Sequence, residues 1–251
     1  MRKKLFERSL EKQHSEDIKY HLFGDPHRRA SGLSDIILGG QDGLVNVLGV
    51  ILGVAAATHD PPIVLVAGLA ATFAESVSMG AVAYTSTLAD ADYYESERAR
   101  EFRHITEVPH LEKNEVHEIY IKKGFEGELL DRIVETITAN EDVWVAVMMS
   151  EEHQLSPTDK RQAIKSALVV GLSAIVGSLI PLAPFAFLPV DLSMVVAVII
   201  TALVLFGVGV YKARTTVGHP GKSGLEMAAI GTLSALVGYI VGALFKIPPA
   251  P

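Results

Sequence analysis

Five segments of the chain are long and apolar enough to cross a lipid bilayer as helices. Crossing the hydrocarbon core takes about 20 mostly apolar residues in helical form. A soluble core can hide one such helix, but few soluble domains need several helices that are apolar on every face. The sequence therefore predicts an all-α membrane protein with spans over residues 35–57, 63–88, 163–183, 191–211 and 225–245.

Charged residues are distributed unevenly along the chain. They make up 20% of the 251 residues, against 49% hydrophobic ones, and they crowd between the second and third spans. The first residues are too highly charged to form a secretory signal. We expect four parts: a cytoplasmic lead-in over 1–33, two spans within 34–89, a cytoplasmic helical insertion over 90–161 and three spans within 162–251.

Lysine and arginine flank the predicted spans on one side of the membrane. Arg28 and Arg29 precede the first span, the insertion is rich in both residue types, and Lys212, Arg214 and Lys222 lie between the last two spans. The other two connections contain neither residue type. Because cytoplasmic loops carry this excess, we expect the lead-in, the insertion and the fourth connection in the cytoplasm and the C-terminus outside.

Composition and motifs argue against several function classes. A net charge of −7 does not favour nucleic acid as a partner and suits cations better. The absence of cysteine excludes disulfides, thiolate zinc sites and cysteine nucleophiles. The stretch "HEIYI" has Ile121 where a zinc-protease motif requires a second histidine. We therefore expect a protein that is not an enzyme and has no prosthetic group.

Two acidic residues lie inside predicted spans, where a charge is costly and usually faces a pathway or a partner. At 1.5 Å per residue, Asp42 lies about 10 Å and Glu75 about 12 Å from the cytoplasmic side of the bilayer. Two carboxylates brought together in a low dielectric repel each other unless a cation or a proton lies between them. Such a pair can exchange one for the other.

One further residue follows each of these acids at a spacing of four, on the same helical face. Asn46 follows Asp42, and Met79 follows Glu75. Carboxylate, amide and thioether groups together suit a divalent transition metal better than Mg²⁺ or Ca²⁺. A role for Met79 in packing remains open.

Rows of acidic residues recur in the insertion, for which we expect three helical stretches. The first continues the second span, the second follows Pro109 and the third starts at Phe125. Like charges at helical spacing weaken a helix unless a cation compensates, although each row by itself is also compatible with a solvated face. Together they indicate a metal-collecting domain with the candidate ligands Glu97, Glu101, His104, Glu112, Glu115, Met148, Met149 and Glu152.

Glycines at a spacing of four in the first and last spans predict closely packed helices. The contact can lie within one subunit or between two. The pairs are Gly39 with Gly43, Gly49 with Gly53, and Gly238 with Gly242.

From about Ser34 onwards the sequence resembles the vacuolar iron transporter family, the VIT1/CCC1 group of divalent-metal transporters. The matching segments are "SDIILGGQDGLVNVLGVILGVA", "AESVSMGAVAY" with "YYESERARE", "VPHLEKNEV", "IYIKKGFEG" and "WVAVMMSEE". The resemblance implies a five-span homodimer with the metal path between its subunits. It also implies antiport of Fe²⁺ out of the cytoplasm against protons.

The resemblance also assigns roles to individual residues. Asp42, Glu75 and Met79 match the family's membrane path. His104 falls where the plant pattern has a glutamate, and imidazole still binds iron or zinc. The residues that match the cytoplasmic metal-binding domain are Glu101, Glu112, Glu115, Met148, Met149 and Glu152.

These observations predict a multi-pass transporter that exports Fe²⁺, and possible further substrates are Mn²⁺, Co²⁺ or Zn²⁺. Its partners are metal ions, protons, the lipid bilayer and a second copy of the chain, in a prokaryotic cell membrane or a eukaryotic vacuolar membrane. The alternative is a membrane-anchored metal buffer or sensor without transport. A membrane metalloenzyme is a weaker third hypothesis, because the candidate ligands are spread over three helices.

Overall fold

The computed structural model describes residues 32–216 and 218–245. The chain divides into two units, Met1–Ser34 and Asp35–Pro251, and the following account concerns the second. Most of the predicted lead-in, residues 1–31, lies outside the described residues. Within the described ranges all regular structure is helical.

Among the described residues, five helices are long and apolar enough to cross a membrane, as predicted. Capping side chains and prolines explain where some of these helices begin. The Asp60 side chain caps the second helix by accepting a hydrogen bond from Ile63 N at 3.3 Å, and prolines stand at the beginning of the second and fifth helices. The five are α2 (Leu33–Thr58), α3 (Pro61–Glu107), α7 (Arg161–Leu182, continued by the 3₁₀-helix η3, Ala183–Ala186), α8 (Val190–Thr215) and α9 (Pro220–Leu244).

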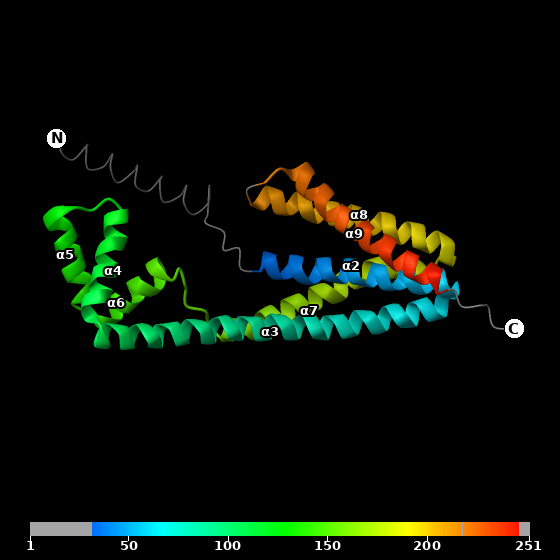
Figure 1. Ribbon diagram of the computed structural model, residues 1–251. Helices are drawn as coiled ribbons and strands as arrows, with labels where there is room; N and C mark the ends of the chain where they lie inside the picture. Colours follow the sequence, from blue (N-terminus) through cyan, green and yellow to red (C-terminus); the bar gives the residue numbers. More distant parts are fainter. Residues whose placement is uncertain (1–31, 217, 246–251) are drawn as a thin grey trace, which may run out of the picture. The chain divides into compact units, whose positions relative to one another are not determined.

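The second span continues without a break into the insertion, as the sequence predicted. Helix α3 has 47 residues and is therefore about 70 Å long, more than twice the roughly 30 Å of a bilayer core. Figure 1 shows its course from the loop after α2 to the insertion helices. It ends at Glu107, because Pro109 disfavours a helical conformation at Val108.

The insertion continues with α4 (Pro109–Lys122), α5 (Gly127–Thr138), α6 (Glu141–Val147) and the π-helix η2 (Met148–Glu152). Gly124 has a φ of +91° and separates α4 from α5. The expected third stretch is thus divided into three elements. The first boundary falls at Asn140, whose side chain accepts a hydrogen bond from Val143 N at 3.1 Å and starts a new helix. The second lies where α6 passes directly into η2 at Met148.

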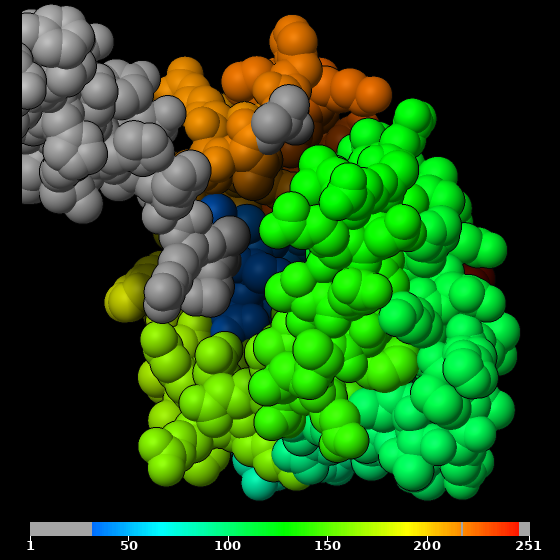
Figure 2. Space-filling view, turned by 90° about the vertical axis from the view of Figure 1, so that its left-hand side faces the viewer, coloured from blue at the N-terminus to red at the C-terminus, as the bar shows by residue number. Residues whose placement is uncertain are grey.

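One hydrophobic core joins the elements of the insertion. Ile105 of α3, Val116 of α4 and Val134 of α5 are buried in it. Trp144 of α6 and Met148 of η2 complete the contact among all five elements. Figure 2 shows the insertion, in green, as a closely packed body in front of the spans. This core fixes the helix faces that carry the acidic rows.

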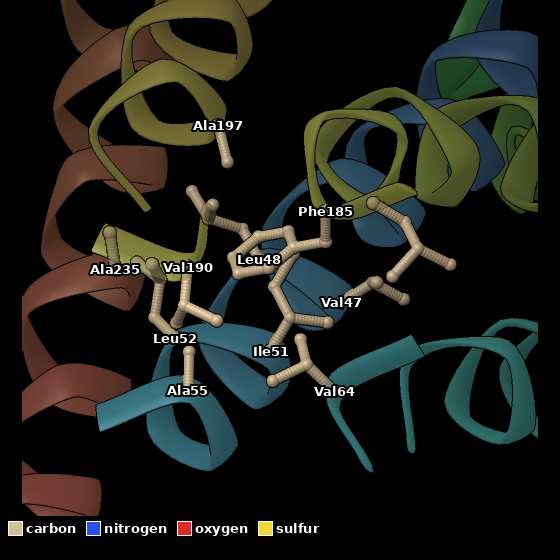
Figure 3. Packing of buried hydrophobic residues seen from close by; sticks show 11 residues of the cluster. Val47, Leu48, Ile51, Leu52, Ala55, Val64, Phe185, Val190, Ala197 and Ala235 are labelled. Carbon is tan, nitrogen blue, oxygen red and sulfur yellow. The ribbon is translucent and has the colours of Figure 1, made fainter. Parts of the chain in front are cut away.

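A second core lies among the spans (Figure 3). Helix α2 supplies its centre with Leu48 and Ile51, which are 1% and 0% exposed. Val64 of α3, Phe185 of η3 and Ala197 of α8 pack around them. One face of α2 is therefore buried against the other spans, whereas many large apolar residues of α3 and α9 remain exposed.

Glycines bring the backbones of α2 and its neighbours into contact within one chain. A Cβ atom added at Gly39 would collide with the Val170 carbonyl of α7. One added at Gly238 would collide with the Gly49 carbonyl, and Gly242 meets Gly53 in the same way. The predicted close packing is confirmed, and these contacts lie within the subunit.

Candidate metal-binding sites

The two acids inside the spans lie side by side. Glu75 of α3 is next to the Asp42 carboxylate and the Asn46 amide of α2. Its Oε1 atom is buried and has no hydrogen-bond partner among the described residues. A buried carboxylate oxygen without a partner is costly, and a bound cation or proton removes that cost.

Helix α7 fixes the part of α3 that carries Glu75. The Ser76 hydroxyl donates a hydrogen bond to the Gly171 carbonyl at 2.9 Å, between residues far apart in sequence. One turn further on, a Cβ atom added at Gly80 would lie 3.2 Å from the Ala167 carbonyl. These contacts hold Glu75 in its register towards α2. Met79, on the same turn as Gly80, is half-buried.

The insertion gathers acids and histidines around Glu101. This α3 residue is 2% exposed. Its Oε1 atom lies 3.0 Å from His153 Nε2 and 3.7 Å from His104 Nδ1. The same His104 nitrogen lies 3.4 Å from Glu112 Oε1, so residues from α3, α4 and the end of η2 converge.

In the part of the chain that the structure describes, two groups of three side chains can each hold a metal ion, and both include Glu101. The first consists of Glu101, Glu152 and His153, and the second of Glu101, His104 and Glu112. In each group the candidate ligand atoms lie within 4.8 Å of one another. Glu101 Oε2 and Glu112 Oε2 are buried without a hydrogen-bond partner in the described part of the chain. Such oxygens are suited to a cation.

The crowding of carboxylates changes their proton affinity. Burial raises the pKa of Glu112 to about 7, with further contributions from the charges of Glu115, Glu101 and Glu152. Burial and the charge of Glu115 also raise the pKa of Glu152. Burial lowers the pKa of His153, but its hydrogen bond to Glu101 and the charge of Glu152 outweigh that effect and raise it. The site therefore attracts positive charge.

The other predicted ligands have different surroundings. Glu97 is buried, and its carboxylate accepts a hydrogen bond from Arg100 Nη1 at 2.9 Å, which compensates its charge. Glu115 is half-buried beside Glu112. Met148 and Met149 are 0% and 1% exposed and belong to the hydrophobic core of the insertion. The structure thus brings together Glu101, His104, Glu112, Glu115 and Glu152 and leaves Glu97 paired with Arg100.

His153 is a candidate ligand that the sequence analysis missed. On a regular helix it would lie about 100° around the axis from Glu152. It reaches Glu101 in the turn that follows the π-helix η2, where His153 N donates to Met148 O at 3.2 Å. Its position directly after Glu152 was the available hint, but periodicity alone gave no reason to pair it with Glu101.

Comparisons with known proteins show similarity over most of the chain. The VIT family model matches residues 33–243. Vacuolar iron transporter 1 of Tulipa gesneriana is 32% identical over 206 residues, which cover 82% of this chain and 83% of that protein. Vacuolar iron transporter 2 of Oryza sativa subsp. japonica is 34% identical, with 82% and 84% covered. The vacuolar iron transporter of Plasmodium berghei (strain Anka) is 31% identical, with 98% and 95% covered.

Proposed function

Because the chain belongs to the VIT family, we propose that it transports Fe²⁺ across a membrane, out of the cytoplasm, in exchange for protons. The observation that carries the proposal is the contact of Glu75 with Asp42 and Asn46 inside apolar helices. A structural anchor has no use for a carboxylate there, because lipid makes an unpaired charge expensive. Mn²⁺, Co²⁺ and Zn²⁺ are proposed as further substrates.

The insertion serves as a collecting domain on the cytoplasmic side. Its carboxylates and histidines bind metal ions and raise their local concentration near the cytoplasmic end of the spans. Glu75 and Asp42, with Asn46 and Met79, then receive the ion within the membrane. Protons that arrive from the opposite side neutralise the acids, lower their metal affinity and release the ion.

We further propose that two copies form the working unit, with the metal path between them. In one chain, only 22% of the apolar window of α3 is buried. Phe73 and Val77, two residues before and after Glu75, are 59% and 73% exposed on the opposite face of the helix. A second copy packed on α3 covers these apolar side chains, in keeping with the family resemblance.

Fe²⁺ flux into proteoliposomes tests the proposal, with and without an imposed pH gradient. We expect gradient-dependent flux for the native chain and none for Glu75→Gln, which removes the exchangeable charge and keeps the shape of the side chain. Glu128→Gln, at an exposed position on α5, is the matched control and should transport normally. Unaltered flux in Glu75→Gln would refute the proposed mechanism.

A metal buffer or sensor is the second candidate function, favoured by the partnerless buried oxygens of Glu101 and Glu112. Absence of flux from folded protein that still binds metal through the insertion would support it. Gradient-dependent flux would exclude a function limited to buffering. Transport and buffering thus predict different results for Fe²⁺ flux and the same result for metal binding by the insertion.

A further inference from the structure

Two histidines direct ring nitrogens at one oxygen of a buried carboxylate. His153 Nε2 and His104 Nδ1 lie 3.0 and 3.7 Å from Glu101 Oε1. Each histidine belongs to a different group of three possible ligands, and each group combines one imidazole with two carboxylates. An ion at either position therefore meets a mixed nitrogen and oxygen set.

Local structure holds His153 in place independently of any ion. The π-helix η2 buries Met148 and Met149 in the core of the insertion. Directly after it, Leu155 N donates to Met149 O at 2.9 Å, and Gln154 takes a φ of +55°. The neighbouring Glu151 is held by Lys123 Nζ at 2.7 Å. The imidazole is thus presented to Glu101 by a turn fixed on both sides.

The second oxygen of Glu101 indicates that these groups are built for a cation. Glu101 is 2% exposed, and its Oε2 atom has no hydrogen-bond partner among the described residues. Glu112, on the other side of His104, has the same kind of oxygen. Histidines that served only to neutralise acids would leave these two atoms unsatisfied.

The nature of the ligands determines which ions they prefer. Carboxylate oxygens suit Mg²⁺, Ca²⁺ and Mn²⁺, whereas imidazole suits zinc, copper, iron and nickel. Sites with nitrogen ligands also follow the order of increasing affinity from Mn²⁺ through Fe²⁺ and Co²⁺ to Ni²⁺. One imidazole in each group therefore increases the difference in binding affinity between Mn²⁺ and the later ions of this series.

We propose that His153 is a specificity-determining metal ligand, which together with His104 makes the insertion select Fe²⁺, Co²⁺ and Zn²⁺ over Mn²⁺. The proposal rests on the proposed function, because it takes the insertion as the place where cargo is collected. It goes beyond that function by assigning selectivity to two residues. The acidic residues provide the negative charge that attracts divalent cations, and the histidines make binding of Fe²⁺, Co²⁺ and Zn²⁺ stronger than binding of Mn²⁺.

Competition binding on the purified full-length chain tests this assignment. Zn²⁺ and Mn²⁺ compete with a fluorescent chelator at one fixed pH, and the ratio of their affinities is the readout. We expect His153→Glu to retain binding of both ions, because a carboxylate replaces the imidazole. The Zn²⁺/Mn²⁺ affinity ratio should fall about tenfold, the scale on which changes around a metal alter affinity.

His104→Glu should lower the ratio in the same direction, and the double variant should lower it further. His110→Gln is the matched control, since His110 is exposed on α4 and belongs to neither group. An unchanged ratio in His153→Glu, with circular dichroism equal to that of the native chain, would overturn the inference.

Flux measurements separate this inference from the proposed function. Native protein that binds Zn²⁺ over Mn²⁺ through the histidines but carries no Fe²⁺ would refute transport and support the inference. Gradient-dependent Fe²⁺ flux with a ratio that does not depend on either histidine would support transport and refute the inference. Lack of binding by the native chain would refute the inference directly.

Discussion

Glu112 shows how one residue couples metal binding to pH. It is 3% exposed, and burial together with neighbouring carboxylates raises its pKa to about 7. A carboxyl group whose pKa is higher in the folded than in the unfolded state is stabilising when protonated. The metal-free insertion is therefore most stable below about pH 4.5 with respect to this group, and it loses that stability as the pH rises through 7.

Metal binding should show the opposite dependence on pH. Each ion bound at Glu112 releases its proton below pH 7, which by itself makes the affinity of the insertion for Zn²⁺ rise about tenfold per pH unit between pH 5.5 and 6.5. The proton displaced from His153, whose pKa is also raised, makes the rise steeper. Isothermal titration in buffers of different ionisation enthalpy measures both the affinity and the released proton.

Two variants serve as comparisons for the pH measurement. Glu112→Gln should bind Zn²⁺ more weakly and with a shallower pH dependence. Glu118→Gln, an exposed change on the same helix, should behave like the native chain. A pH dependence that is equally steep in Glu112→Gln would show that other groups determine it.

Helices α2 and α9 approach each other closely because glycines without side chains lie at their contact. The carbonyls of Gly49 and Gly53 occupy the space where Cβ atoms of Gly238 and Gly242 would lie. The Ser234 hydroxyl donates to the Val45 carbonyl at 2.9 Å in the same interface. Because α2 also carries Asp42 and Asn46, this packing holds one side of the membrane site.

Gly238→Ala should force α2 and α9 apart, because the new methyl group meets backbone that cannot move aside by rotation of a side chain. We expect a loss of about 1–3 kcal/mol in stability, the usual cost of overpacking. Thermal unfolding of the detergent-solubilised chain measures it.

Gly207→Ala provides the matched control for this substitution. Gly207 lies in α8 with nothing within 4 Å of an added Cβ atom, and alanine has the higher helix propensity. Its melting temperature should stay equal or rise. Equal melting of Gly238→Ala and native protein would contradict the packing argument.

For the whole molecule, α3 joins the two kinds of site. The same helix carries Glu75 among the spans and Glu101 in the insertion, about 39 Å further along at 1.5 Å per residue. Lys160, just before α7, lies 2.8 Å from Asp92 and 3.3 Å from Glu95 of α3. A second connection thus ties the start of α7 to the part of α3 that leaves the membrane.

The proposed orientation can be tested because the chain contains no cysteine. Glu126→Cys places a thiol on the insertion, and Phe187→Cys places one in the connection between α7 and α8, where Phe187 is 85% exposed. In intact cells a membrane-impermeant maleimide should label only Phe187→Cys. In inverted vesicles it should label only Glu126→Cys, and the reverse pattern would overturn the orientation.

Features that depend on neighbours along the chain could be predicted without the structure. Hydropathy over about 20 residues located the five spans, and helical periodicity with Pro109 gave both the continuity and the end of α3. The sequence predicted that Asp42 and Glu75, in antiparallel neighbouring spans, lie at a similar depth. Their side-by-side placement comes from the structure. The predicted features all follow from length, period and polarity.

Features that depend on contacts between distant segments became visible in the folded chain. The fold determines which helix each glycine contacts. It also places Glu101 in two groups of possible ligands and brings His153 next to that carboxylate after a π-helical turn. It also divided the predicted third stretch of the insertion at Asn140. A regular periodicity cannot foresee these outcomes, because a widened turn and a packed core are set by contacts across the fold rather than by the order of residues within one helix.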